Sequence, residues 1–328
     1  FLLTRNLRLL RMNISTVCIR QGKFYGEMRW NIIIKFRWLQ GTVIIFLFWI
    51  IQIRAGAGWQ TRALILSRQI GRHSAAPILE KTERADKNGG DREVNSILKF
   101  LGCGAAFYPV LGNTSAYFIK NNNLYLLDCG ELVFHQLYER GMLTRYDRIY
   151  SIITHLHADH VGSLGSLISY TYFVLGKKIR VIHPEESVRQ LLDLTGIDRN
   201  AYYFEQCTRY ESDGIVFEAV PVRHAEDMNC YGYIIEDGGR RIYYSGDSYE
   251  IPERVINGFL ERRIEKIYQD TTNKVSSHRS HFPLSELKEL IPEELRAQVF
   301  CMHFGCDFSA EIEQLGFNNA EKYLAQQR

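Results

Sequence analysis

The sequence predicts an α/β domain in which two packed sheets are flanked by helices. Three observations support this fold class. Short apolar strands alternate with amphipathic helices from residue 96 onward, and both halves of that region contain strands with helices between them. In addition, the 328 residues are 46% hydrophobic and 23% charged, which is an ordinary globular composition. A disordered, collagen-like or disulfide-scaffold protein is therefore excluded.

The distribution of charge predicts a boundary near Val94. Residues 1–93 hold 16 of the 40 Lys and Arg and 6 of the 37 Asp and Glu, so their net charge is +10 and that of residues 94–328 is −7. All four Trp lie before this boundary, whereas nine of the ten His lie after it. We therefore expect an N-terminal extension, residues 1–93, followed by one folded domain, residues 94–328.

The N-terminal extension is expected to be non-native or disordered. Residues 87–93 have the composition that a purine-rich ribosome-binding site would give if it were translated, and Val94 can be encoded by an alternative start codon. The competing interpretations are a membrane anchor or a signal peptide built on the apolar run at residues 38–53. That run is shorter than the roughly 20 residues that a bilayer-spanning helix needs. No membrane association is expected for residues 94–328.

The elements of the folded domain follow from its periodicity and turn signals. In its first half we expect strands at residues 97–101, 116–119, 124–127 and 149–154, and helices at residues 131–140 and 162–175. In its second half we expect strands at residues 180–182, 215–222, 231–235, 241–245, 266–269 and 298–302, and helices at residues 185–194, 284–290 and 310–315. Three consecutive asparagines, Asn121 to Asn123, predict a hairpin turn.

Cysteine spacing and charge narrow the function classes. The six cysteines after residue 94 form no Cys-x-x-Cys pair, so we expect reduced, buried thiols and neither a disulfide framework nor a zinc finger. This usage is typical of a cytoplasmic protein. Because the folded domain is acidic, we expect no binding of duplex nucleic acid through charge.

Residues 154–160, Thr-His-Leu-His-Ala-Asp-His, carry the chemistry of the domain. They place four metal-binding side chains directly after a predicted buried strand and directly before a predicted helix. On an extended strand His155 and His157 point to the same side, and the following turn brings Asp159 and His160 around the same space. Imidazole and carboxylate groups at this density suit zinc or a similar first-row ion.

This motif resembles that of the metallo-beta-lactamase superfamily, His-x-His-x-Asp-His at a strand-to-helix corner, and the resemblance extends over residues 96–328. It implies an αββα sandwich. Three later residues that follow apolar strands match further family ligands, namely His224, Asp247 and His303. The resemblance implies one metal ion held by His155, His157 and His224, another held by Asp159, His160 and His303, and Asp247 between the two ions.

The implied cofactor is a pair of zinc ions, with manganese as the alternative. Two cations roughly 3.5 to 4 Å apart lower the pKa of a bridging water and hold both oxygens of an in-line displacement. The nucleophile is then a metal-bridging hydroxide, and Asp159 is expected to orient it as well as to bind metal. Asp128, which closes a predicted strand, matches a family carboxylate that hydrogen-bonds a ligand imidazole.

Within the superfamily, residues 101–106, 112–115 and 127–131 resemble the first motif of ribonuclease Z and related phosphodiesterases. Two departures matter. The chain has Tyr-Gln-Asp-Thr at residues 268–271, where ribonuclease Z has a His-Glu-Ala-Thr motif that supplies a proton donor. The span between His224 and Asp247 also has no room for a tRNA-gripping arm. A small phosphodiester, such as a cyclic nucleotide, is therefore the expected substrate, and the chain is similar to cyclic-nucleotide phosphodiesterases, including the anti-Pycsar enzymes of phages.

Substrate contacts are expected from four residues. Tyr202 and Tyr203 could stack a base, because aromatic faces accept any base. His281 is the candidate for contacting phosphate or protonating the leaving oxygen, and His278 is the alternative. Dimers are usual in the branch that the chain resembles, so we also expect a homodimer.

Three alternative functions stay open. A ribonuclease Z-like tRNA 3′ endonuclease would use the same metal ions with a longer substrate. A thioester or lactone hydrolase would use them with an acyl pocket, and the ribonuclease Z-like first motif argues against it. A non-catalytic metal-binding module would be expected to lack some ligands, whereas all seven are present here.

Overall fold

The computed structural model describes residues 98–274 and 279–324 in full, together with the backbone of four strands in the N-terminal extension. The chain divides into two compact units, Phe1–Gly89 and Gly90–Arg328. The strands of the first unit pair antiparallel in sequence order: β1 (Asn13–Phe24), β2 (Glu27–Arg37), β3 (Val43–Ala55) and β4 (Gly58–Ile65).

The boundary expected near Val94 lies outside the described residues, and the non-native origin of the extension stays a prediction. Most of the apolar run at residues 38–53 belongs to strand β3. Among the described residues, every helix is too short or too polar to cross a membrane.

The second unit contains two sheets. The first sheet has six strands in the order β10-β9-β8-β7-β6-β5. They are β5 (Lys99–Gly102), β6 (Ser115–Lys120), β7 (Asn123–Leu127), β8 (Ile149–Ile152), β9 (Ile179–His183) and β10 (Tyr202–Gln206). Strands β7, β8, β9 and β10 run parallel to one another, so their C-terminal ends lie at the same edge of this sheet.

The second sheet has the order β11-β12-β13-β14-β15-β17-β18, and β16 pairs with β15 beside it. Its strands are β11 (Arg209–Ser212), β12 (Ile215–Val222), β13 (Cys230–Asp237), β14 (Arg240–Tyr244), β15 (Lys266–Thr272), β16 (Phe282–Pro283), β17 (Val299–Met302) and β18 (Asn318–Asn319). Strands β14, β15 and β17 are parallel, so a second set of C-terminal strand ends meets at one edge.

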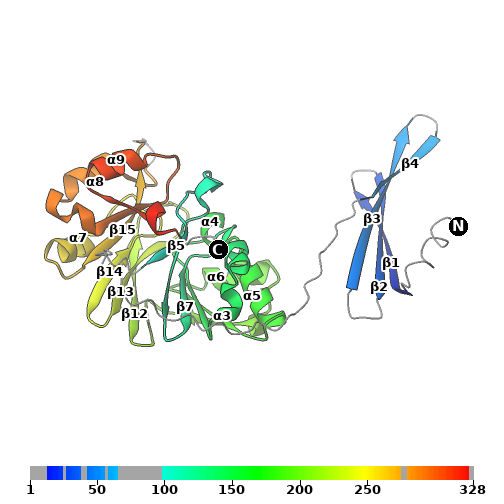
Figure 1. The fold of residues 1–328 in the computed structure, drawn as a ribbon, viewed down its shortest axis with the longest axis horizontal. Coiled ribbons are helices and arrows are strands. Elements are labelled where there is room, and N and C mark those ends of the chain that lie inside the picture. Colours follow the sequence, from blue (N-terminus) through cyan, green and yellow to red (C-terminus); the bar gives the residue numbers. More distant parts are fainter. Residues whose placement is uncertain are drawn as a thin grey trace, which may run out of the picture. The chain divides into compact units, whose positions relative to one another are not determined.

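Helices cover the outer face of each sheet, as Figure 1 shows for the second unit. The helices of the first half are α2 (Val133–Glu139), α3 (Met142–Arg145), α4 (Ala158–Val161), α5 (Leu164–Phe173) and α6 (Ser187–Leu194). Those of the second half are α7 (Glu253–Leu260), α8 (Leu284–Leu290) and α9 (Ser309–Gln314). The described residues of this unit also form four short 3₁₀ helices, at Pro109–Leu111, Arg199–Ala201, Glu293–Gln298 and Ala320–Tyr323. The predicted α/β class, with two packed sheets flanked by helices, is confirmed.

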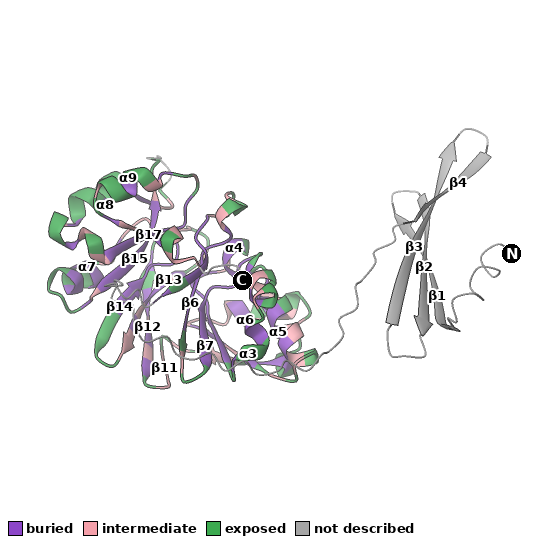
Figure 2. Ribbon diagram, in the orientation of Figure 1, coloured by how far each residue is buried: buried purple, intermediate pink, exposed green. Residues whose placement is uncertain are grey.

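Strand β7 shows why the sequence gives this layering. All five of its residues are buried, because the strand has hydrophobic neighbours on both faces. Tyr125 and Leu127 belong to the core between the two sheets, whereas Leu124 and Leu126 pack in a second core under helices α2, α3, α5 and α6. Figure 2 shows the strands as mainly buried and the helices as exposed on their outer sides.

Two backbone connections lie at opposite ends of the strands. The hairpin between β6 and β7 turns through Asn121 and Asn122, whose positive φ angles of 50° and 60° suit a two-residue turn. At the other end, the amide of Phe304 donates to the carbonyl of Cys103 at 2.8 Å, and the amide of Ala105 donates to the carbonyl of Phe304 at 2.9 Å. This pairing joins the loop after the first strand of the domain to the residue that follows His303.

Candidate metal centre

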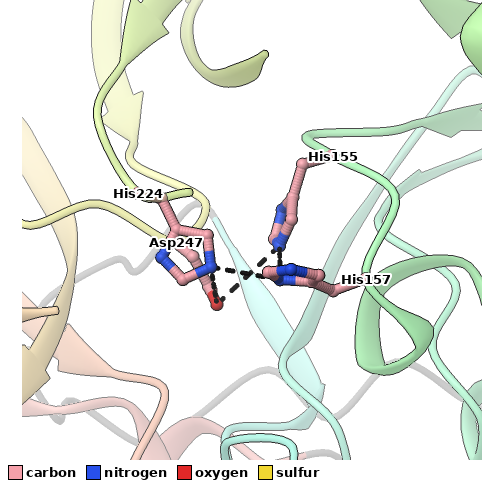
Figure 3. A group of neighbouring side chains, drawn as sticks. All are labelled: His155, His157, His224 and Asp247. Atoms are coloured by element: carbon pink, nitrogen blue, oxygen red, sulfur yellow. Dashed lines mark hydrogen bonds and ion pairs between the residues drawn. The ribbon is translucent and has the colours of Figure 1, made fainter. Parts of the chain in front are cut away.

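One group of four side chains converges between the loops that follow β8, β12 and β14 (Figure 3). Nδ1 of His157 lies 3.0 Å from Nε2 of His155 and 3.1 Å from Nε2 of His224. Oδ2 of Asp247 lies 3.9 Å from Nε2 of His155 and 3.6 Å from Nε2 of His224. We call these four residues the first group.

A second group shares Asp247 and adds Asp159, His160 and His303, and all four residues are buried. Oδ2 of Asp159 lies 3.3 Å from Nε2 of His160 and 3.2 Å from Nε2 of His303. The two oxygens of Asp247 lie 3.1 Å from Nε2 of His160 and 3.2 Å from Nε2 of His303. The structure therefore brings together all seven predicted ligands, with Asp247 common to both groups.

The chemistry of these atoms fits first-row metal ions. Imidazole nitrogens and carboxylate oxygens are zinc ligands at about 2.0 to 2.2 Å, so tetrahedral neighbours lie about 3.3 Å apart. The separations of 3.0 to 3.9 Å in the two groups bracket that value. Nε2 of His160 and Oδ1 of Asp247 lie 3.1 Å apart but make no hydrogen bond, and both are buried, so a bound cation would satisfy both atoms.

Hydrogen bonds on the far side of three imidazole rings orient Nε2 toward the groups. Nδ1 of His155 lies 3.0 Å from the hydroxyl of Thr154, and Nδ1 of His160 lies 2.9 Å from Oδ2 of Asp128. Nδ1 of His224 donates to the carbonyl of Ser280 at 2.7 Å. Such partners fix the tautomer and ring orientation of metal-binding histidines.

Asp128 connects two of these rings. Its carboxylate accepts hydrogen bonds from the amide of Thr154 at 2.8 Å and from the Thr154 hydroxyl at 3.0 Å, in addition to its contact with His160. Because Thr154 in turn contacts His155, one buried carboxylate supports a histidine of each group. The role that the family resemblance implies for Asp128 stays a prediction, and its contact with His160 supports that prediction.

The two groups differ in electrostatic character. Burial and the neighbouring imidazoles lower the pKa values of His155 and His157, so both rings are neutral and ready to bind a cation. Burial alone would lower the pKa of His303, but nearby carboxylates, Asp247 first among them, raise it to about 10. The second group is therefore rich in negative charge, which attracts cations.

Glycines allow the close approach of the loops that carry the ligands. A Cβ atom on Gly130 would lie 1.9 Å from the carbonyl oxygen of Asp159. Residues 128–130 can therefore pack this closely against the motif loop only because Gly130 has no side chain. The amide of Cys129 also donates to the carbonyl of His160 at 2.7 Å. Before Asp247, Gly246 has a φ of 58°, and a Cβ there would lie 2.8 Å from Cβ of Thr154.

His281 lies beside the two groups. Its ring centroid is 5.2 Å from that of His224 and 5.0 Å from that of His303, and its side chain is 30% exposed. This position suits the contact with substrate that the sequence predicts. His278, the alternative candidate, lies outside the described residues.

The two tyrosines predicted to stack a base do not reach the groups. They are the first residues of β10, and Tyr202 pairs with Ile179, the first residue of β9, so they lie at the end of the sheet opposite the ligand loops. Tyr202 is 4% exposed and packs in the core under the helices, so its ring is not available to a ligand. Tyr203 is 49% exposed, and its ring is covered by Lys178 and Arg180. The stacking role does not fit these positions.

Sequence reasoning missed Asp270. It lies in the Tyr-Gln-Asp-Thr segment, and its place beside His303 comes from the parallel pairing of β15 with β17, for which the local sequence has no signal. Asp247, Asp270, His281 and His303 also form a third close group. Since the oxygens of Asp270 face Nδ1 atoms of the two histidines at 2.7 and 3.5 Å, we interpret this group as a hydrogen-bonded support of the centre.

Comparison with known proteins agrees with the geometry of the centre. The family model of anti-Pycsar protein Apyc1 matches residues 96–324. The chain belongs to this family. An anti-Pycsar protein Apyc1 of Bacillus phage BSP38 is 30% identical over 234 residues, covering 63% of this chain and 88% of that protein. Another, from Paenibacillus xerothermodurans, is 25% identical over 236 residues, covering 67% of this chain and 92% of that protein.

Solved structures similar to this Apyc1 family member show its fold. The metallo-beta-lactamase fold protein YhfI from Bacillus subtilis aligns with a TM-score of 0.53 at 15% identity, covering 69% of this chain and 92% of that one. A diphosphatase of the PhnP family aligns with a TM-score of 0.53 at 22% identity, covering 68% and 93%. The predicted metallo-beta-lactamase fold is confirmed. The family, together with the cluster of candidate metal ligands, supports a hydrolase of the phosphodiesterase type.

Proposed function

We propose that the protein is a dinuclear metal-dependent phosphodiesterase that hydrolyses a small phosphodiester such as a cyclic nucleotide. The observation that carries this proposal is the pair of ligand groups that share Asp247. His155, His157 and His224 would hold one ion, and Asp159, His160 and His303 would hold the other, with zinc as the expected metal and manganese as the alternative. Membership of the anti-Pycsar family supports the choice of substrate.

The chemistry divides between the ions and the chain. Bound ions would lower the pKa of a water molecule and neutralise charge on the phosphate. Asp159, at the start of α4, would help to hold one ion and orient the attacking oxygen. His281 bonds Asp270 through Nδ1, which leaves Nε2 as the ring atom that can contact a phosphate oxygen or donate a proton to the leaving oxygen.

The connection between His224 and Asp247 favours a compact substrate over tRNA. Strands β13 and β14 occupy most of this span, and the remaining residues are the short loop 225–229, the turn at Gly238 and Gly239, and residues 245–246 before Asp247. An arm that grips a long RNA has no residues there from which to form. The charge of −7 on residues 94–328 points the same way, since a long polyanion is repelled by an acidic protein.

A substrate panel tests the proposal. The full chain, loaded with zinc or manganese, is assayed against 3′,5′-cyclic nucleotides, an aryl phosphodiester, precursor tRNA, a thioester and a lactone. We expect the small phosphodiesters to be hydrolysed much faster than precursor tRNA, with little dependence of the rate on salt. A His224→Ala preparation, purified in the same way, controls for contaminating phosphodiesterases.

Two outcomes would contradict the proposal. Efficient, salt-sensitive cleavage of precursor tRNA at its 3′ trailer, without action on cyclic nucleotides, would favour the ribonuclease interpretation. Faster turnover of the thioester or lactone would favour an acyl hydrolase instead.

A further inference from the structure

Asp270 occupies a position that joins three parts of the candidate centre. It lies in β15, has no solvent-exposed surface, and pairs with Met302 of the parallel strand β17, directly before His303. Its amide donates to the hydroxyl of Ser245 at 2.9 Å, and the amide of Ser248 donates to its Oδ2 at 3.0 Å. The segment that carries Asp247 therefore fixes Asp270 through both its backbone and its side chain.

The carboxylate of Asp270 faces two imidazole rings. Oδ2 accepts a hydrogen bond from Nδ1 of His281 at 2.7 Å, and Oδ1 lies 3.5 Å from Nδ1 of His303. Oδ1 of Asp270 and Nδ1 of His303 are both buried and have no other polar partner among the described residues. The ring of His303 belongs to the second group, whereas the ring of His281 lies outside the first and second groups but beside them.

The residue type matters at this point. A carboxylate can accept hydrogen bonds at both oxygens, so Oδ2 accepts from the Ser248 amide and from His281 while Oδ1 faces Nδ1 of His303 as an acceptor. An asparagine of the same shape would present an NH₂ group to one of these donors. One of the two rings would then lose its partner or change its tautomer, and a histidine that binds metal through Nε2 depends on that tautomer.

We propose that Asp270 is a positioning residue that orients His303 for metal binding and His281 for contact with substrate. The role of His281 in this inference rests on the proposed function, whereas the orientation of His303 for metal binding is independent of any substrate. A single substitution should therefore affect two measurements that are otherwise separate, the affinity for one metal ion and the turnover of the fully loaded enzyme.

Asp270→Asn in the full chain tests this inference. Zinc titration of metal-free protein against a competing chelator should show one ion bound about 10 to 100 times more weakly and the other unchanged. With both sites saturated, kcat for a cyclic nucleotide should still fall about tenfold or more, with KM nearly unchanged, because His281 is misoriented. His281→Gln should lower kcat without changing the affinity for either ion.

The control is Asp213→Asn, since Asp213 also accepts bonds from an amide and a hydroxyl, Asn123 and Tyr125, both at 2.6 Å, but contacts neither group. It should leave metal affinity and kcat unchanged. If Asp270→Asn does not fold by circular dichroism, Asp270→Glu provides the same test, because it keeps an acceptor carboxylate but displaces it.

The inference is overturned if a folded Asp270 variant binds both ions as tightly as the parent chain, or weakens both ions equally. Full turnover by the metal-saturated variant would also overturn it. Failure of the proposed function gives a different result, namely normal two-ion binding by the parent chain without hydrolysis of any phosphodiester.

Discussion

Oδ2 of Asp128 lies 2.9 Å from Nδ1 of His160, and neither side chain has any solvent-exposed surface. The same carboxylate accepts bonds from the backbone and hydroxyl of Thr154, which contacts His155. Asp128 has a φ of 64°, a left-handed conformation that is uncommon outside glycine. Such strain is retained where the surrounding structure requires it. Here it directs the Asp128 carboxylate toward Thr154 and His160, and so toward both ligand groups.

Asp128→Asn should weaken metal binding more than it weakens folding. We expect the affinity for the ion held by Asp159, His160 and His303 to fall about 10- to 100-fold, because the NH₂ group would face a donor. The free energy of unfolding of the metal-free protein should fall by about 1 to 3 kcal/mol for the unsatisfied buried group. Zinc titration and urea unfolding measure the two quantities, with the exposed Asp198→Asn as the control. Unchanged zinc affinity would contradict the supporting role.

His155→Ala combined with His157→Ala should reduce the bound metal from two equivalents to one. These rings supply two of the four ligand atoms of the first group, and a single imidazole with a shared carboxylate is too few to hold zinc tightly. Metal analysis of the purified protein and an activity assay provide the measurement, and His135→Ala, an exposed histidine on α2, is the control. If the double variant retains two equivalents and turns over substrate, the first group is assigned wrongly.

Asp159→Ala should reduce turnover far more than stability. Its 4% exposure places Asp159 inside the site, with its carboxylate between imidazoles of the second group. Its removal therefore affects metal binding and the orientation of the attacking oxygen, whereas it leaves the apolar core intact. Comparing kcat/KM with the free energy of unfolding decides the matter, and comparable losses would favour a structural role.

Gly130→Ala should disrupt the centre through backbone packing alone. The new Cβ would lie 1.9 Å from the carbonyl oxygen of Asp159, so either residues 128–130 or the motif loop must shift. Overpacking of this kind costs about 1 to 3 kcal/mol of stability, and the displacement of Asp159 should lower activity further. Gly305→Ala is a matched control near His303, because nothing lies within 4 Å of its added Cβ. Equal behaviour of the two variants in thermal unfolding and turnover would contradict this account.

A chain that begins at Val94 should fold and retain full activity. All seven ligands and both hydrophobic cores lie within residues 98–324, so the extension is not needed for either. Thermal unfolding and phosphodiester hydrolysis by this shorter chain and the full chain test the expectation. An intact mass of native protein that includes residues upstream of Val94, or loss of activity on truncation, would refute it.

Much of the fold could be predicted from local pattern. Strand β12 (Ile215–Val222) and helix α8 (Leu284–Leu290) have the expected bounds, because each combines a clear hydrophobic period with polar ends. Helix α7 was missed although Val255, Ile256 and Phe259 form a buried helical face after Pro252. Strands β10 and β11 were missed because they are largely exposed edge strands with weak alternation.

The candidate site could likewise be predicted only in part from the local sequence. The seven ligands follow apolar strands, so their local sequence shows where each belongs, and the structure brings all of them together. The neighbours of Tyr202 and Asp270 depend on which strands pair and in which direction. Parallel pairing of β9 with β10 carries Tyr202 away from the centre, and parallel pairing of β15 with β17 places Asp270 beside His303. Such long-range pairing has no local sequence signal.

The backbone pairing of Phe304 with Cys103 and Ala105 joins segments from opposite ends of the domain, beside the last ligand. A chain emerging from a ribosome exposes all four residues of the first group long before it exposes His303. The two groups are therefore completed in a fixed temporal order during synthesis. The second group is completed only when the segment around His303 meets the loop after β5, so its ion would bind after most of the domain has been made.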